Sequence, residues 1–161
     1  MTITYQSAVI FVQDMQTSRA FYEGLLDQQV EMDFGANVGY VGGLALWEAQ
    51  HALQMIYDET RSPASPLGQH NLELYFETED LDAAWARLEA AQVTVVHPIK
   101  TQPWAQRALR VCDPDGHIIE IAEPMPVVIQ RLLGEGLSEE QVSERTSMPL
   151  PIVQQIAAAR T

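Results

Sequence analysis

Two stretches that share one pattern decide the fold: SAVIFVQDM at residues 7–15 and ELYFETEDL at residues 73–81. Around each stretch apolar residues recur at every second position, which is typical of a β-strand with one buried face. These positions are Ala8, Ile10 and Val12 in the first case and Leu72, Leu74 and Phe76 in the second. Each stretch then reaches an aspartate, Asp14 or Asp80, suited to cap a following helix. The sequence therefore predicts two similar strand–helix units.

Short strand-like runs separated by turn residues follow each predicted helix. They lie at 30–34, 37–41 and 44–48 in the first half, and at 93–96, 107–112 and 117–122 in the second. Each half thus reads as a βαβββ unit. We expect the first unit at residues 1–57, the second at 70–124, and a flexible connector at 58–69, which is rich in Pro, Ser and Gly.

Residues 125–161 have the pattern of a helical tail. Pro126 is suited to open a helix that ends at Gly134 or Gly136, and Pro151 is suited to start another. Between them, Ser138 and the glutamine three residues later have the spacing of a capping box. The predicted fold class is α+β, with two βαβββ units followed by this tail.

Composition excludes several classes of protein. The 161 residues carry 22 acidic side chains against 9 Lys and Arg, a net charge of −13, which argues against binding to nucleic acid or anionic membranes. The single Cys112 excludes a disulfide framework. No apolar run has the 18 residues that a membrane span needs, and the N-terminus lacks the basic segment of a signal peptide. We expect a soluble cytoplasmic protein.

Four segments together resemble the vicinal oxygen chelate superfamily, which includes glyoxalase I, extradiol dioxygenases, fosfomycin resistance proteins and bleomycin-binding proteins. They are VQDMQTSRAFYEGLL (12–26), ETEDLDAAWARLEAA (77–91), QPWAQRALRV (102–111) and DPDGHIIEI (113–121). The resemblance covers about residues 4–124. It implies that the two units form a curved mixed sheet with a cleft, and that the protein is a homodimer, commonly with clefts completed across subunits.

The resemblance also places metal ligands at four strand positions, matched here by Ser7, Trp47 or Glu48, Glu73 and Glu120. A divalent metal needs about three converging protein donors, and a serine hydroxyl is a poor one. Glu73 and Glu120 are good hard donors, so the decision falls on Glu48. Strand alternation in LALWE favours Trp47 facing the cleft, although a one-residue slip would reverse this. We predict either no cofactor or a weakly bound Mn, Ni, Zn or Mg ion.

Other candidates for the cleft are aromatic or charged. The candidates for ligand contact are Trp47, Trp104, Tyr75, Tyr40 and Arg110. Aromatic rings are suited to stack on a planar ligand. Arg110 is also suited, with Arg107, to neutralise Glu73, Glu77 and Glu120. If these carboxylates lie close together without a metal, repulsion should raise the pKa of at least one of them; alternatively they form a solvated polar face.

Two functions stay open. The first is a binder of the bleomycin-resistance type that holds a small amphipathic or cationic molecule without essential metal. The alternative is a metal-dependent glyoxalase-like lyase or a related dioxygenase, with Glu73 or Glu120 as metal ligand or proton-transfer base. A minor alternative is a DNA-associated regulator, because the tail looks like a helix–turn–helix segment. Three arginines against four glutamates in residues 125–161 argue against DNA binding and favour packing or dimerisation.

Overall fold

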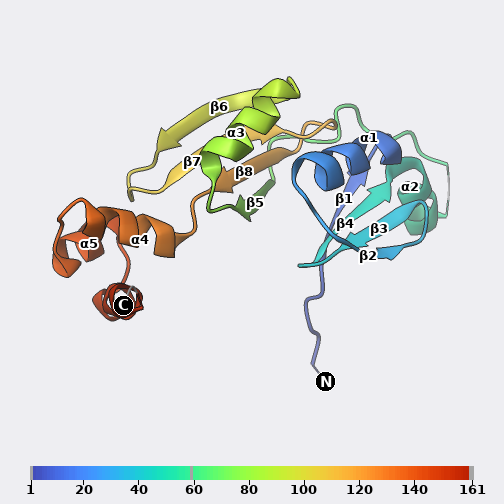
Figure 1. Ribbon diagram of the computed structural model, residues 1–161. Helices are drawn as coiled ribbons and strands as arrows, with labels where there is room; N and C mark the ends of the chain where they lie inside the picture. Colours follow the sequence, from blue (N-terminus) through green and yellow to red (C-terminus); the bar gives the residue numbers. More distant parts are fainter. Residues whose placement is uncertain (1, 59, 160–161) are drawn as a thin grey trace. The chain divides into compact units, whose positions relative to one another are not determined.

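A computed structural model describes residues 2–58 and 60–159. The chain forms two compact units, each with its own four-stranded sheet and helices (Figure 1). Unit 1 comprises Met1–Leu72 and Cys112–Ile118, and unit 2 comprises Glu73–Val111 and Ile119–Thr161. The predicted α+β class with two βαβββ units and C-terminal helices is confirmed. Within the described ranges, no helix combines the length and the apolar character that crossing a membrane requires.

The sheet of unit 1 has the strand order β1-β4-β3-β2. Its strands are β1 (Ala8–Val12), β2 (Val30–Asp33), β3 (Asn37–Tyr40) and β4 (Leu44–Glu48). β1 pairs with β4 in parallel and the other pairs are antiparallel, as a βαβββ unit requires. Between β1 and β2 the chain forms α1 (Met15–Arg19), which continues as a π-helix, η1 (Ala20–Leu25). Asp14 caps α1 as predicted, because its side chain accepts a hydrogen bond from the Thr17 amide at 2.6 Å.

Unit 1 also contains a helix that the sequence analysis did not predict, α2 (Ala49–Tyr57). It follows β4 directly and packs against β4 and β1. Ala49 and Ala52 are fully buried, since small side chains let the helix approach the sheet closely. Glu48, the last residue of β4, is the N-cap of this helix.

The sheet of unit 2 has the strand order β5-β8-β7-β6. Its elements are β5 (Glu73–Glu77), α3 (Leu81–Ala90), β6 (Thr94–Thr101), β7 (Arg107–Cys112) and β8 (Ile118–Ala122). Asp80 caps α3 as predicted, through a bond of 2.9 Å from the Ala83 amide. The strand predicted at 93–96 is longer than expected, because β6 continues through Pro98. A proline is tolerated there because β6 lies at the edge of the sheet, where one side of the strand has no partner to bond.

Three helices form the tail: α4 (Met125–Gly134), α5 (Glu139–Thr146) and α6 (Leu150–Ala158). Their buried apolar side chains pack together with Ala105, which precedes β7, and they include Val128, Ile129, Leu132, Val142 and Val153. Ser138 and Gln141 form the predicted capping box at the start of α5. The predicted helix end at Gly134 is confirmed, and α6 begins one residue before the expected Pro151.

Candidate functional site

One side chain from each strand of the unit 2 sheet meets at Arg110. The Arg110 cluster consists of Glu73 on β5, Glu120 on β8, Arg110 on β7 and His97 on β6. The Nε of Arg110 donates to Glu73 Oε2 at 2.6 Å, and one terminal nitrogen donates to Glu120 Oε2. The other terminal nitrogen lies 3.1 Å from His97 Nε2. The strand order therefore lines up two acids, a base and an imidazole across the sheet.

The two carboxyl groups of the cluster have different environments. The Glu120 side chain is only 6% exposed, whereas that of Glu73 is 38% exposed. Burial raises the pKa of Glu120, and the neighbouring Glu73 adds to the rise. The hydrogen bond from Arg110 lowers the pKa of Glu73. The cluster thus pairs an ionised carboxylate at the surface with a more basic carboxyl group that is buried beside it.

A chain of hydrogen bonds links the aromatic candidates of unit 2. Trp104 Nε1 donates to Gln106 Oε1 at 2.8 Å, Gln106 Nε2 donates to the Tyr75 hydroxyl at 2.9 Å, and that hydroxyl donates to Glu77 Oε1 at 2.8 Å. Burial raises the pKa of Tyr75, and the carboxylates of Glu77 and Glu120 add to the rise. We name these four residues (Tyr75, Glu77, Trp104 and Gln106) the aromatic network.

The aromatic network has one buried residue, Gln106, and two rings that are exposed to solvent. Gln106 is 4% exposed and also donates to the Glu123 carbonyl oxygen at 2.7 Å, which fixes its orientation. Tyr75 is 50% exposed and Trp104 38% exposed. Sequence reasoning missed Gln106, although the Pro-Trp motif two residues earlier pointed to this segment. The arrangement presents two aromatic rings to solvent with their polar atoms held in place.

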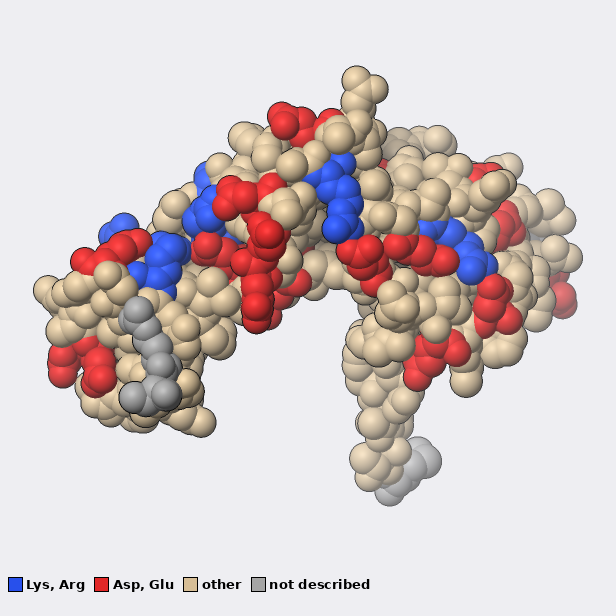
Figure 2. Space-filling model, in the orientation of Figure 1, with Lys and Arg blue, Asp and Glu red and all other residues tan. Residues whose placement is uncertain are grey.

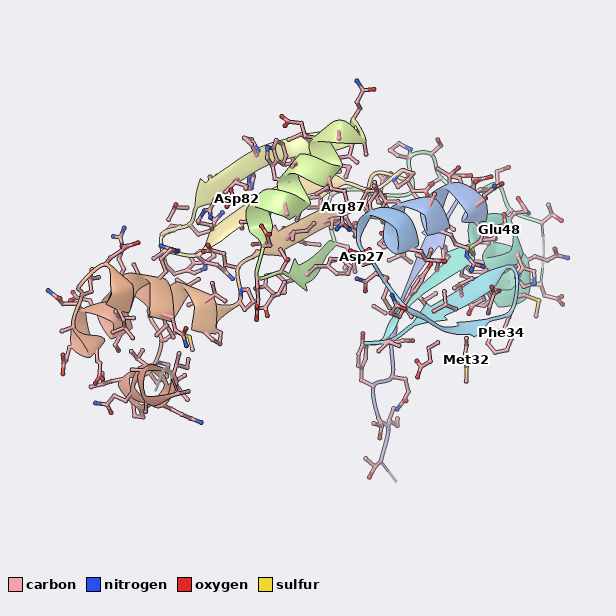
Figure 3. The ribbon with its side chains drawn as sticks, viewed as in Figure 1. Asp27, Met32, Phe34, Glu48, Asp82 and Arg87 are labelled. Atoms are coloured by element: carbon pink, nitrogen blue, oxygen red, sulfur yellow. The ribbon has the colours of Figure 1, made fainter. Side chains whose placement is uncertain are left out.

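The remaining candidates belong to unit 1, where each has a structural partner. Tyr40 is 1% exposed and its hydroxyl donates to Glu23 at 3.1 Å. Trp47 Nε1 donates to His51 Nδ1 at 2.9 Å. The Glu48 carboxylate accepts bonds from the Gln50 and His51 amides, at 3.1 and 2.7 Å, and Figure 3 shows Glu48 where β4 meets α2.

The donor set, as arranged, does not fit a divalent metal. Ser7 is exposed, and both oxygens of Glu48 are committed to the α2 cap. Glu73 and Glu120 remain, but both are already bonded to the positively charged guanidinium of Arg110. Across residues 2–58 and 60–159 no group of three His, Cys, Asp or Glu side chains is arranged to hold a metal ion. A cation is present among the carboxylates, and it is an arginine.

A second buried polar group in unit 1 was also missed by sequence reasoning. Asp113, in the turn between β7 and β8, accepts hydrogen bonds from the Tyr22 hydroxyl at 2.8 Å and from the amides of His117 and Asp115 at 2.8 and 3.0 Å. His117 Nδ1 also lies 3.0 Å from its Oδ2. The Asp113 side chain is completely buried. The DPDG motif was the signal, since Asp in such a turn bonds its own backbone. This group holds the turn against η1 and stabilises the fold.

Basic side chains on one face of the molecule lie close to acidic ones. Figure 2 shows that on the visible face Lys and Arg side chains lie beside Asp or Glu in both units. In the tail, Arg131 is paired with Glu123 at 2.9 Å and Glu135 at 3.5 Å. DNA binding needs several basic side chains that are available for phosphates, and the paired Arg131 does not add to them.

The two βαβββ units have the architecture of the vicinal oxygen chelate superfamily, and the family comparison gives the same class. Residues 5–126 match the family of the glyoxalase-like domain, and the chain belongs to that family. Among curated proteins, none matches this chain.

Solved structures agree with this family. A protein of unknown function from Agrobacterium tumefaciens is 35% identical, with a TM-score of 0.71 over 77% of this chain and 96% of that chain. A lactoylglutathione lyase from the same organism is 21% identical, with a TM-score of 0.59 over 78% and 96%. A glyoxalase/bleomycin resistance protein/dioxygenase from Nocardioides is 21% identical, with a TM-score of 0.60 over 76% and 84%. The last two likenesses concern the fold alone.

Proposed function

We propose that this protein binds a small amphipathic or cationic organic molecule on the unit 2 sheet, without an essential metal. The observation that carries the proposal is the aromatic network: two exposed rings whose polar atoms are held by the buried Gln106. Rings fixed in this way lose little conformational freedom when a ligand stacks on them. The Arg110 cluster lies on the same sheet. Burial and Glu77 are the larger causes of the raised Tyr75 pKa, and Glu120 is close enough to add to it.

Charge favours a cation over an anion at this surface. Glu73, Glu77 and Glu120 carry three carboxyl groups, and Arg110 bonds two of them, Glu73 and Glu120. A planar cation would gain both from the excess of carboxylate and from the electron-rich ring faces. An anion would be repelled.

Three probes of similar shape test the proposal: N-methylquinolinium, neutral 2-methylquinoline and 2-naphthalenesulfonate. Binding is measured by isothermal titration calorimetry on purified full-length protein treated with EDTA. We expect the cation to bind at least ten times more tightly than the anion, with the neutral probe between them. Equal binding of cation and anion, or no binding of any probe, would contradict the proposal.

Two variants locate the binding surface. Trp104→Ala should weaken cation binding by roughly 2- to 30-fold, the range expected for a partly desolvated cation–π contact. Trp85→Phe, on α3, is the matched control and should leave the affinity unchanged. If both variants bind as the wild type does, the ligand lies elsewhere. A metal-dependent lyase remains the alternative, and stoichiometric metal in the wild type, removed by EDTA, would support it instead.

A further inference from the structure

The side chains that surround Arg110 are of the types that usually bind metal ions. Two carboxylates and an imidazole approach one cationic group from β5, β8 and β6, while the cation itself comes from β7. Carboxylate oxygen and imidazole nitrogen are the donors that bind Zn²⁺ and Mn²⁺ in proteins. The arrangement differs from the ligand set expected from the sequence, because His97 takes part and Glu48 does not.

His97 is oriented as a metal-binding histidine would be. Its Nδ1 lies 2.8 Å from the carbonyl oxygen of Pro98, a contact that places the proton on Nδ1. Nε2 then has a free lone pair, and it points at a terminal nitrogen of Arg110 at 3.1 Å. A backbone carbonyl that fixes the tautomer in this way is the usual support of a ligating histidine.

Arg110 supplies the counter-charge of the buried Glu120. The Glu120 side chain is 6% exposed, and a buried carboxylate needs a counter-charge with good hydrogen-bonding geometry. The guanidinium meets that need and also bonds Glu73. One positive charge therefore reduces the repulsion between the two carboxylates. A divalent ion entering the cluster would have to come close to this fixed positive charge.

We propose that Arg110 replaces a divalent metal as the cation of this cluster, and that its side chain alone keeps a Glu73–His97–Glu120 metal site from forming. Each of the three donors contacts a different nitrogen of the guanidinium, so removing the group vacates the space that they surround. Glu73 and His97 lie near the surface and can move inward, so the donors can close to about 2.0–2.2 Å from an ion, with water completing the coordination. This inference does not depend on the organic ligand proposed above.

Four proteins test it by calorimetric titration with ZnCl₂ and MnCl₂, after removal of any histidine tag: the wild type, Arg110→Ala, Arg110→Lys and the double variant Arg110→Ala/Glu120→Gln. We expect Arg110→Ala to bind one Zn²⁺ per chain at least ten times more tightly than the wild type. Arg110→Lys keeps the positive charge and should remain as metal-free as the wild type. The double variant should lose at least ten-fold in affinity, which separates this site from other surface histidines.

Thermal unfolding supplies a readout that requires no assigned activity. Zn²⁺ should raise the melting temperature of Arg110→Ala and leave that of the wild type unchanged, because a ligand that binds the folded state stabilises it. If Arg110→Ala does not fold, Arg110→Ser, with a polar side chain at the vacated position, takes its place. A folded variant that lacks the site would overturn the inference. Stoichiometric metal in the wild type that is lost in Glu120→Gln would also overturn it. The N-methylquinolinium titration of the wild type tests the proposed function separately.

Discussion

Replacing Tyr22 with Phe should destabilise unit 1 measurably, because it removes one hydroxyl and changes little else. Tyr22 is completely buried, and its hydroxyl donates to Asp113 Oδ2 at 2.8 Å. The acceptor side chain is completely buried as well. A hydrogen bond to a charged group contributes about 1.5–3 kcal/mol to stability, and phenylalanine fills nearly the same volume.

The expected loss lies at the lower end of this range. Asp113 keeps three other donors in the variant: His117 Nδ1 and the amides of Asp115 and His117. The carboxylate is therefore not left unpaired, and we expect Tyr22→Phe to cost about 1.5–2 kcal/mol. For a chain of this length that corresponds to roughly 3–8 °C in melting temperature.

Tyr40→Phe is a matched control in the same unit. Tyr40 is 1% exposed, and its hydroxyl also donates to a carboxylate, Glu23, at 3.1 Å. The Glu23 side chain is 31% exposed, so water can replace the lost bond. We expect a loss of about 0.5–1 kcal/mol, which is the contribution of an ordinary hydrogen bond.

Urea unfolding followed by far-ultraviolet circular dichroism measures both losses, and the pH dependence tests their cause. Burial pushes the pKa of Asp113 upward, but the hydrogen bonds and charge of His117 and the bond from Tyr22 outweigh it and hold the pKa below 3.8. A lowered folded pKa contributes stability that is present above the unfolded pKa and is lost as the pH falls through the folded one. The deficit of Tyr22→Phe should therefore shrink below about pH 4. A loss at pH 7 no larger than that of Tyr40→Phe would refute the reasoning.

Four further substitutions have clear expectations. Gly68→Ala should cost about 2–3 kcal/mol in urea unfolding, because its Cβ would lie 2.0 Å from the backbone of the β7–β8 turn; Gly24→Ala, with nothing within 4 Å, should be neutral or slightly stabilising. Glu73→Gln should cost less than about 1 kcal/mol at pH 7, since the side chain is 38% exposed. Because Arg110 lowers the Glu73 pKa below 4.5, this difference should fade when unfolding is repeated near pH 3. Ser138→Ala should cost about 1 kcal/mol by removing the α5 cap, seen as faster amide hydrogen exchange in the first turn of α5.

Signals confined to a few neighbouring residues allowed the prediction of much of the fold. The caps at Asp14 and Asp80 and the box at Ser138 each depend on contacts within three residues, and each formed as expected. The helix α2 was missed for a related reason. Its cap is Glu48, and glutamate is not among the residue types that commonly cap a helix, so the local sequence has no recognisable start signal there.

Only part of the candidate site could be predicted, because its residues come from different strands. The positions of Glu73 and Glu120 within their strands, together with the resemblance, were enough to select them. Their link to His97 depends on the strand order β5-β8-β7-β6, which follows from pairing between segments far apart in the chain. His97 precedes a proline, and in isolation it read as a boundary residue. Only the sheet order shows that it lies across Arg110 from Glu120.

A net charge of −13 by itself indicates only that acidic side chains are common on the surface. Glu120 shows why the total is a poor guide to a site. A carboxylate that is 6% exposed responds to the nearest cation far more than to the field of the whole protein, because water screens distant charges and leaves buried pairs almost unscreened. In this chain that cation is Arg110, covalently attached and always charged. The Zn²⁺ titration of Arg110→Ala tests whether this arginine keeps a divalent metal out of the cluster, and metal analysis of the wild type separates a protein that binds small molecules without metal from a metal-dependent enzyme.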